Sequence, residues 1–229
     1  MFRKLPYVIS VLVLIGGVTV AVATSHFSTG PLPSRTNAPE VAGLPHEPVC
    51  TQCHLIFDDN GMQVNNLNAP GGYVRILDLP ETWSPGNTYT LRVQLSSDST
   101  IAAPSRKWGF QLTAVKASDG AGVGTFVLPS TDSLQIVDVD AFDPWTDRRY
   151  VEHKSLATHV GESGPIEWSF QWQAPPSPAG AVYFYVAGNA ANGSLDPGGD
   201  WIYTSGDTMA DTTTAVRSTS WGGLKKLWR

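Results

Sequence analysis

Charge and cysteine are both scarce in this sequence. Only 15% of its 229 residues are charged, and the formal net charge is −5 at pH 7. A chain of this kind lacks the basic surface that phosphate binding requires, so we do not expect a nucleic-acid partner. Long surface helices, which are usually rich in lysine and glutamate, are not expected either.

The motifs of common hydrolytic enzymes are also missing. The sequence has neither a Gly-x-Ser-x-Gly elbow nor a His-Glu-x-x-His motif. Its two cysteines belong to one short motif, so no further thiol could act as a nucleophile if that motif binds a cofactor. We therefore expect a carrier or a binding module rather than a classical enzyme.

Glycine, proline and tryptophan are plentiful, with 22, 17 and 8 residues respectively. This composition is typical of short strands joined by tight turns. The chain has room for one β-sandwich and a short appended segment, but hardly for two full domains.

Residues 1–23 have the features of a secretory signal peptide. A basic start precedes an apolar stretch over residues 7–20, and Ala21-Val22-Ala23 offers a small-residue cleavage site. The alternative is an uncleaved membrane tether, because residues 5–23 are just long enough to span a bilayer. In both cases the rest of the chain is exported, to the periplasm or the cell surface.

Residues 24–48 contain five prolines and have neither a helical nor a strand period of apolar residues. Such a segment is expected to be an extended, mobile linker. The sequence therefore predicts a tether between the export signal and the next motif.

That motif is the run Cys50-Thr51-Gln52-Cys53-His54, within a segment expected to cover residues 49–70. A disulfide across a two-residue gap closes almost no loop and would add little stability. The histidine directly after Cys53 explains the spacing better, because two thioethers can hold one haem c while His54 ligates the iron as the proximal residue.

The Cys-x-x-Cys-His motif has three other interpretations. A thioredoxin-like redox pair requires a βαβ context, which the following residues do not provide. A structural zinc site requires four ligands, and no second pair of cysteine or histidine follows at a suitable spacing. A vicinal disulfide without a cofactor remains open.

The sequence offers several candidates for the distal ligand of the iron. Met62 follows a turn close to the motif, and a thioether ligand there would raise the reduction potential of the haem. His153 lies beside an expected strand, and a pair of histidine ligands would give a lower potential. An open or water-bound position is a further alternative. The other candidate residues are His26, His46, His159 and Met209.

Residues 71–216 predict an all-β domain. Seven runs have apolar residues that alternate with polar ones or form short apolar stretches between turn signals. They cover residues 73–77, 88–95, 108–115, 134–137, 168–172, 181–187 and 201–204. About seven or more short strands of this kind favour an immunoglobulin-like β-sandwich.

The same region resembles the bacterial form of the Reeler, or reelin-type, domain, also known as the choice-of-anchor V domain. The motifs that carry the resemblance are WGFQLTA (108–114), WQAP (172–175), YFYVAGNAANG (183–193) and GDWIYT (199–204). The resemblance runs from about Val49 to about Met209 and implies a β-sandwich outside the cytoplasm. Bacterial members are similar in carrying Cys-x-x-Cys-His before the first strand and a Tyr-x-x-His segment, which matches Tyr150 to His153.

Two further features have weaker interpretations. Acidic residues near 138–143 and 196–200 could offer oxygen ligands to Ca²⁺, but their spacing fits no calcium loop and favours turns. The C-terminal tail, residues 217–229, has no span of membrane length and would form a final strand, a packed tail or a short interfacial contact.

Three functions remain open. The first is one-electron transfer by a mono-haem c-type cytochrome that serves a redox partner protein or a membrane electron-transfer chain. The second is a binding or adhesion module of the reelin type, with a structural haem or none. The third is a haem sensor or weak peroxidase, which would require an open iron position.

Overall fold

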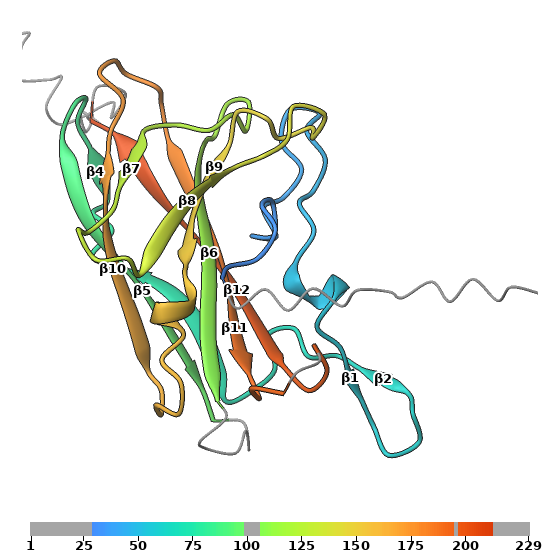
Figure 1. The fold of residues 1–229 in the computed structure, drawn as a ribbon. Helices are drawn as coiled ribbons and strands as arrows, with labels where there is room; N and C mark the ends of the chain where they lie inside the picture. Colours follow the sequence, from blue (N-terminus) through green and yellow to red (C-terminus); the bar gives the residue numbers. More distant parts are fainter. Residues whose placement is uncertain (1–28, 99–105, 195–196, 213–229) are drawn as a thin grey trace, which may run out of the picture.

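The computed structural model describes residues 29–98, 106–194 and 197–212. Within these ranges the chain folds into two packed sheets and one small separate hairpin (Figure 1). The four-stranded sheet has the order β3 (Gly72–Leu77), β5 (Thr88–Ser97), β10 (Ile166–Gln173) and β7 (Thr125–Val127). The six-stranded sheet has the order β4 (Thr82–Trp83), β12 (Trp201–Asp211), β11 (Val182–Ala191), β6 (Lys107–Lys116), β9 (Arg149–His153) and β8 (Leu134–Asp138).

The remaining elements lie around the CxxCH motif and beside β9. A 3₁₀ turn, η1 (Cys50–Gln52), forms the start of the motif, and the hairpin of β1 (Ile56–Phe57) and β2 (Gln63–Val64) follows it. A second 3₁₀ turn, η2 (Ser155–Ala157), follows β9. In Figure 1 the hairpin projects away from the body of the sandwich.

Aromatic side chains fill the space between the two sheets. Every second residue of β10 is buried, as the alternation in its sequence requires. Phe110 of β6 packs on Trp168 with ring centroids 4.7 Å apart, and Trp172 meets Phe184 edge to face at 5.2 Å. Such pairs add about 0.5–1.5 kcal/mol each beyond the area that they bury.

The predicted fold class is confirmed. Each of the seven expected runs corresponds to a strand of the sandwich, namely β3, β5, β6, β8, β10, β11 and β12; the run 181–187 begins one residue before β11. Strand β9 and the short strands β4 and β7 complete the sheets. No helix among the described residues is long and apolar enough to cross a membrane. The signal segment 1–23 and the tail 217–229 lie outside the described ranges.

The expected mobile linker is wrong for residues 29–48, which pack against the sandwich; residues 24–28 lie outside the described ranges. Figure 1 shows this segment, in blue, on the side of the six-stranded sheet that faces away from the four-stranded sheet. The backbone N–H of Arg35 donates to Oε1 of Gln111 on β6 at 2.7 Å. The segment has no apolar period because polar side chains hold it in place.

Glu47 is the main anchor of this segment. Its side chain is fully buried and accepts hydrogen bonds at 2.5 Å from both Arg148 Nη1 and the Tyr150 hydroxyl. Its second oxygen accepts from the hydroxyl and the N–H of Thr36, at 2.6 and 3.2 Å. Burial, together with the Glu47 charge, raises the pKa of Tyr150, so the phenol stays protonated and acts as a donor.

We expect Glu47→Ala to destabilise the fold by about 3–5 kcal/mol, because it leaves the Arg148 charge buried and unpaired. Urea unfolding measures the loss. Glu40→Ala, at an exposed position of the same segment, is the matched control and should change the free energy of unfolding by less than about 0.5 kcal/mol. Equal effects of the two substitutions would contradict the anchoring role of Glu47.

Candidate functional site

The CxxCH motif forms a single tight turn. The carbonyl of Cys50 accepts hydrogen bonds from the N–H of Cys53 at 3.1 Å and of His54 at 2.9 Å. Residues three and four positions apart on such a turn lie on the same side of it. The turn therefore favours a common direction for the two thiols and the imidazole.

The two cysteines differ in environment, and they are not joined in a disulfide. Cys53 is exposed, whereas Cys50 is partly buried with its sulfur 4.0 Å from the carbonyl oxygen of Arg35. Burial raises the pKa of the Cys50 thiol to about 12, and the nearby Arg35 charge offsets this only in part. A redox-active CxxC pair requires a thiol with a lowered pKa, so the thioredoxin-like interpretation gains no support from this site.

His54 is held by a buried carboxylate. Its Nδ1 lies 2.7 Å from Oδ2 of Asp200, and the side chain of Asp200 is 4% exposed against 31% for His54. If Nδ1–H donates to this carboxylate, the lone pair of His54 lies on Nε2. A metal-binding histidine usually has this arrangement, with one ring nitrogen hydrogen-bonded to a carboxylate and the other left for the metal.

Further polar contacts join the motif to strands β11 and β12. Asn66 donates to the backbone oxygens of His54 at 2.9 Å and of Asp200 at 2.7 Å. Leu67 and Ile202 form a parallel bridge. The segment after the motif is therefore fixed to the sandwich at the start of β12.

The ring of His153 lies against β6 of the six-stranded sheet. It occupies the space that a side chain at Gly109 would require, because a Cβ atom on Gly109 would lie 2.4 Å from Cε1 of His153. Gly109 pairs with Asn189 on β11, and Nδ2 of Asn189 is 3.4 Å from Nδ1 of His54. Strand β6 thus lies between β9, which carries His153, and β11, which carries Asn189 beside His54.

His153 is nevertheless buried and already hydrogen-bonded. Its Nδ1 lies 3.0 Å from the backbone nitrogen and 3.2 Å from the carbonyl oxygen of Phe110, and burial lowers its pKa to about 4. Among the described residues, no group of three or more His, Cys, Asp or Glu side chains is arranged to hold a metal ion. The assignment of His153 as distal ligand stays a prediction.

The other sequence candidates for the distal ligand lie elsewhere. Met62 is 67% exposed at the end of the β1–β2 hairpin, and Met209 is buried in the core. His159 lies 3.2 Å from Glu162, and His46 is exposed on the N-terminal segment. His26 falls outside the described residues. No hydrogen bond or ion pair joins any of the described candidates in this group to His54.

The acidic residues considered for calcium have other contacts. Asp138 pairs with Arg149 at 3.0 Å, and Asp143 accepts from the N–H of Trp145 at 3.0 Å. Asp200 is the partner of His54, and Asp196 lies outside the described ranges. These contacts give Asp138, Asp143 and Asp200 structural roles, whereas Asp140 is exposed.

The residues at the motif fit a covalently bound haem. The turn brings the backbone of Cys50, Cys53 and His54 together, and Nδ1 of His54 is the ring nitrogen that contacts Asp200, so that Nε2 would be the one to ligate an iron. Oδ1 of Asn189, which is buried beside them, has no hydrogen-bond partner in the described part of the chain. A bound group, or water held with it, would supply the donor that this oxygen lacks.

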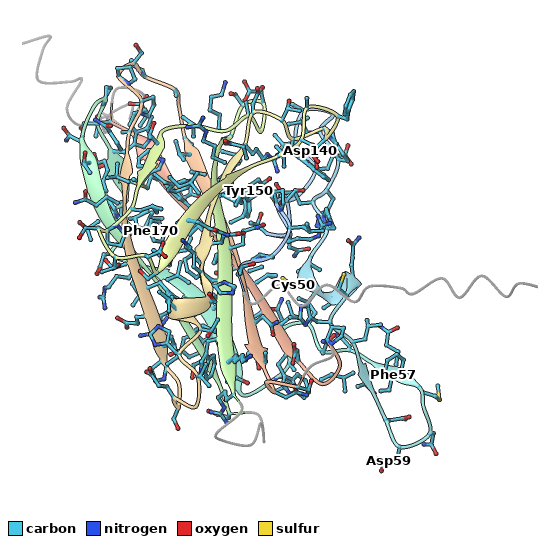
Figure 2. The ribbon with its side chains drawn as sticks, in the orientation of Figure 1. Cys50, Phe57, Asp59, Asp140, Tyr150 and Phe170 are labelled. Carbon is cyan, nitrogen blue, oxygen red and sulfur yellow. The ribbon has the colours of Figure 1, made fainter. Side chains whose placement is uncertain are left out.

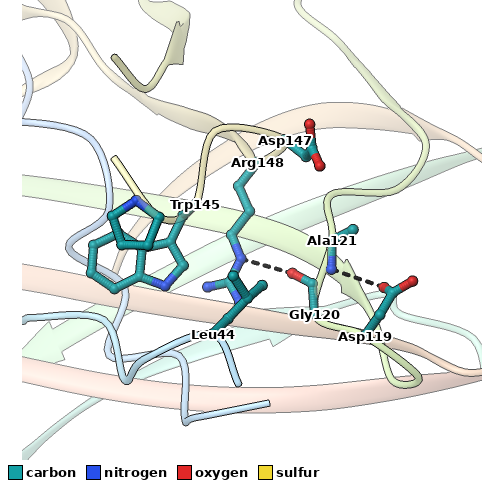
Figure 3. Close-up of a pocket in the computed structure, with 8 residues that line it drawn as sticks. Leu44, Asp119, Gly120, Ala121, Trp145, Asp147 and Arg148 are labelled. Carbon is teal, nitrogen blue, oxygen red and sulfur yellow. Dashed lines mark hydrogen bonds between the residues drawn. The ribbon is translucent and has the colours of Figure 1, made fainter. Parts of the chain in front are cut away.

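A separate hollow of about 290 Å³ lies between the N-terminal segment and two loops (Figure 3). Arg148 lines it and donates from Nε to the carbonyl of Gly120 at 2.9 Å. Asp119 and Trp145 also line it, but no cysteine or histidine does. It is therefore not part of the motif site.

Comparisons with known proteins show similarity to solved structures at low sequence identity. No family model and no curated protein matches the chain. The Reeler domain of human F-spondin is similar at 19% identity and a TM-score of 0.38, with 62% of this chain and 89% of that chain covered. A cohesin module from a Clostridium perfringens family 33 glycoside hydrolase is similar at 9% identity and a TM-score of 0.37, with coverages of 61% and 96%.

Asp200, Asn189 and Asn66 were not recognised from sequence as supports of His54. Asp200 belongs to the GDWIYT motif, and Asn189 to the motif at residues 183–193. For Asn189 motif membership was the only signal, and Asp200 was also among the acidic residues considered for calcium. Their role depends on contacts with a residue far away in the chain, because Asp200 is 146 positions from His54.

The buried neighbours Glu152 and His153 give opposite pH effects. Burial raises the pKa of Glu152 from 4.5 to about 7, and burial lowers the pKa of His153 from 6.5 to about 4. Because the pKa of Glu152 is raised, the folded state loses stability as pH rises from 4.5 to 7. Because the pKa of His153 is lowered, the folded state loses stability as pH falls from 6.5 to 4. The two effects cancel where the windows overlap.

Protein made without haem attachment should therefore have a nearly flat free energy of unfolding between pH 4.5 and 6.5. In His153→Gln the free energy should fall as pH rises through this window, by up to about 1.4 kcal/mol per unit. In Glu152→Gln it should fall as pH decreases. Urea titrations at a series of pH values measure how the free energy of unfolding of each variant changes with pH. Slopes of equal sign in the two variants would refute the opposite pKa shifts of Glu152 and His153.

Proposed function

We propose that this chain is an exported mono-haem c-type cytochrome whose haem is attached to Cys50 and Cys53, with His54 as the axial ligand. The observation that carries the proposal is the hydrogen bond of His54 Nδ1 to the buried Asp200, next to two thiols on the same turn. When bound, the haem supplies a one-electron couple. The function that follows is one-electron transfer rather than classical enzymatic catalysis.

The protein's own residues hold and shield the group. Asp200 and Asn66 fix the orientation of His54 and of its backbone. Cys50 is partly buried against Arg35, so one attachment point lies at the N-terminal segment and the other, Cys53, faces solvent. Of the two residues that would hold the group, Cys50 is therefore covered by the protein and Cys53 is accessible to a partner.

The distal position is proposed to be His153 or to be open. Nδ1 of His153 can accept from the N–H of Phe110, or, in the other tautomer, donate to the Phe110 carbonyl. Only the second tautomer leaves Nε2 as a lone pair for iron. An open position would instead support ligand sensing or weak peroxidase activity.

The partner and location are part of the same proposal. Residues 1–23 act as an export signal or as a retained membrane tether. The electron donor or acceptor is a redox protein or a membrane electron-transfer chain in the same extracytoplasmic compartment. Neither nucleic acid nor calcium is required.

A second candidate function is an extracellular binding or adhesion module with a structural haem or none. The β1–β2 hairpin favours it, because Phe57, Met62 and Val64 are 56%, 67% and 36% exposed. Figure 2 shows Phe57 and Asp59 on this hairpin, well away from the sandwich residues Tyr150 and Phe170. An exposed apolar element of this kind is typical of an interaction site.

Covalent attachment separates the two functions. After co-expression with a haem-attachment system, we expect the denatured protein to be heavier by one haem and to have a reduced-minus-oxidised spectrum of c type. Cys50→Ser and Cys53→Ser should each lower the yield of attached haem, and the double variant should abolish it. An unchanged mass in the wild-type protein would leave only the binding module.

The distal assignment is tested by His153→Ala, with Met62→Leu as the control at an exposed position. If His153 ligates the iron, its loss should convert a low-spin absorption spectrum into a high-spin one. Met62→Leu should leave the spectrum unchanged. A high-spin spectrum already in the wild-type protein would instead indicate an open position.

A further inference from the structure

Asp200 is placed so that its charge acts on His54. The residue is 3% exposed and precedes β12 directly. Its Oδ1 accepts the N–H of Asn192 at 2.9 Å, and its Oδ2 lies 2.7 Å from Nδ1 of His54 and 3.3 Å from Nδ2 of Asn189. Among the described residues its ion-pair partner is His54, not a lysine or an arginine. Neutral N–H groups and the imidazole are therefore its partners.

We propose that Asp200 is a positioning residue that orients His54 and lowers the reduction potential of a haem bound through it. This inference rests on the proposed haem attachment. Asp200 lies outside the Cys-x-x-Cys-His motif, and its negative charge is expected to lower the reduction potential of the iron.

The physical reason is the strength of a charged hydrogen bond in a buried place. A carboxylate that accepts Nδ1–H makes the imidazole a stronger electron donor through Nε2. Electron donation by the axial ligand stabilises the ferric state relative to the ferrous state, since the ferric iron carries the higher charge. Burial of Asp200 reduces the screening of this effect by water.

Asp200→Asn tests the inference in the haem-loaded protein. The substitution keeps the size of the side chain and one acceptor oxygen but removes the negative charge. We expect the ferrous-to-ferric ratio at a fixed applied potential to rise about tenfold, which corresponds to about 59 mV for a one-electron couple. Asp200→Glu, which restores the charge, should bring the ratio back toward the wild-type value.

Asp211→Asn is the matched control. Asp211 is also a buried aspartate, at the other end of β12, where it accepts the N–H groups of Ala179 and Gly180. The same chemical change there should leave the ferrous-to-ferric ratio unchanged. Equal shifts in Asp200→Asn and Asp211→Asn would overturn the inference.

The mass of the denatured protein separates this inference from the proposed function. Attached haem with an unshifted ratio in Asp200→Asn would overturn the role of Asp200 and leave the cytochrome assignment intact. Absence of attached haem in the wild-type protein would overturn both.

A second measurement applies even if Asp200→Asn fails to fold. Nitrogen-15 NMR of the haem-free wild-type chain reports which ring nitrogen of His54 carries the proton. The inference requires a protonated Nδ1 and an unprotonated Nε2 in the neutral ring. The opposite tautomer would overturn it.

Discussion

A buried carboxylate at Glu47 ties the N-terminal segment to the sandwich, and the position of the CxxCH motif depends on it. Its ion pair with Arg148 and its hydrogen bonds with Tyr150 and Thr36 join the segment to the loop before β9 and to β9 itself. The pair is fully buried, so the loss of either partner costs more than an ion pair on the surface would. The motif begins only three residues after this anchor, and its turn is therefore set against the six-stranded sheet.

The second attachment comes from the other side of the motif, through His54 and Asp200. Together the two anchors make residues 29–54 and the segment after the β1–β2 hairpin part of the sandwich, while the hairpin itself projects from it. The residues that support His54 then come from the strands of the sandwich. His54 is supported by the residues at the start of β12 and in β11, and the candidate ligand His153 comes from β9.

The sequence predicted the parts of this structure that depend on local patterns. Strand alternation at β5, β6 and β10 is visible within single runs, since it needs only the two-residue period of a sheet face. The CxxCH spacing is equally local. The packing of residues 29–48 was missed because Glu47 finds Arg148 at a separation of 101 positions, and no apolar period marks the contact. Asp200 was noticed only as an acidic turn residue, because its partner His54 lies on another part of the chain.

In the proposed cytochrome the CxxCH motif and the sandwich form one cooperative unit. The most direct test follows urea unfolding of the haem-loaded protein by two signals, the Soret absorption of the haem and the fluorescence of the buried tryptophans. We expect a single midpoint for both signals, because the ligation of His54 and the packing of Trp168 and Trp172 are lost together. A Soret transition that is complete while the tryptophan signal is still native would show that the motif and the sandwich unfold separately.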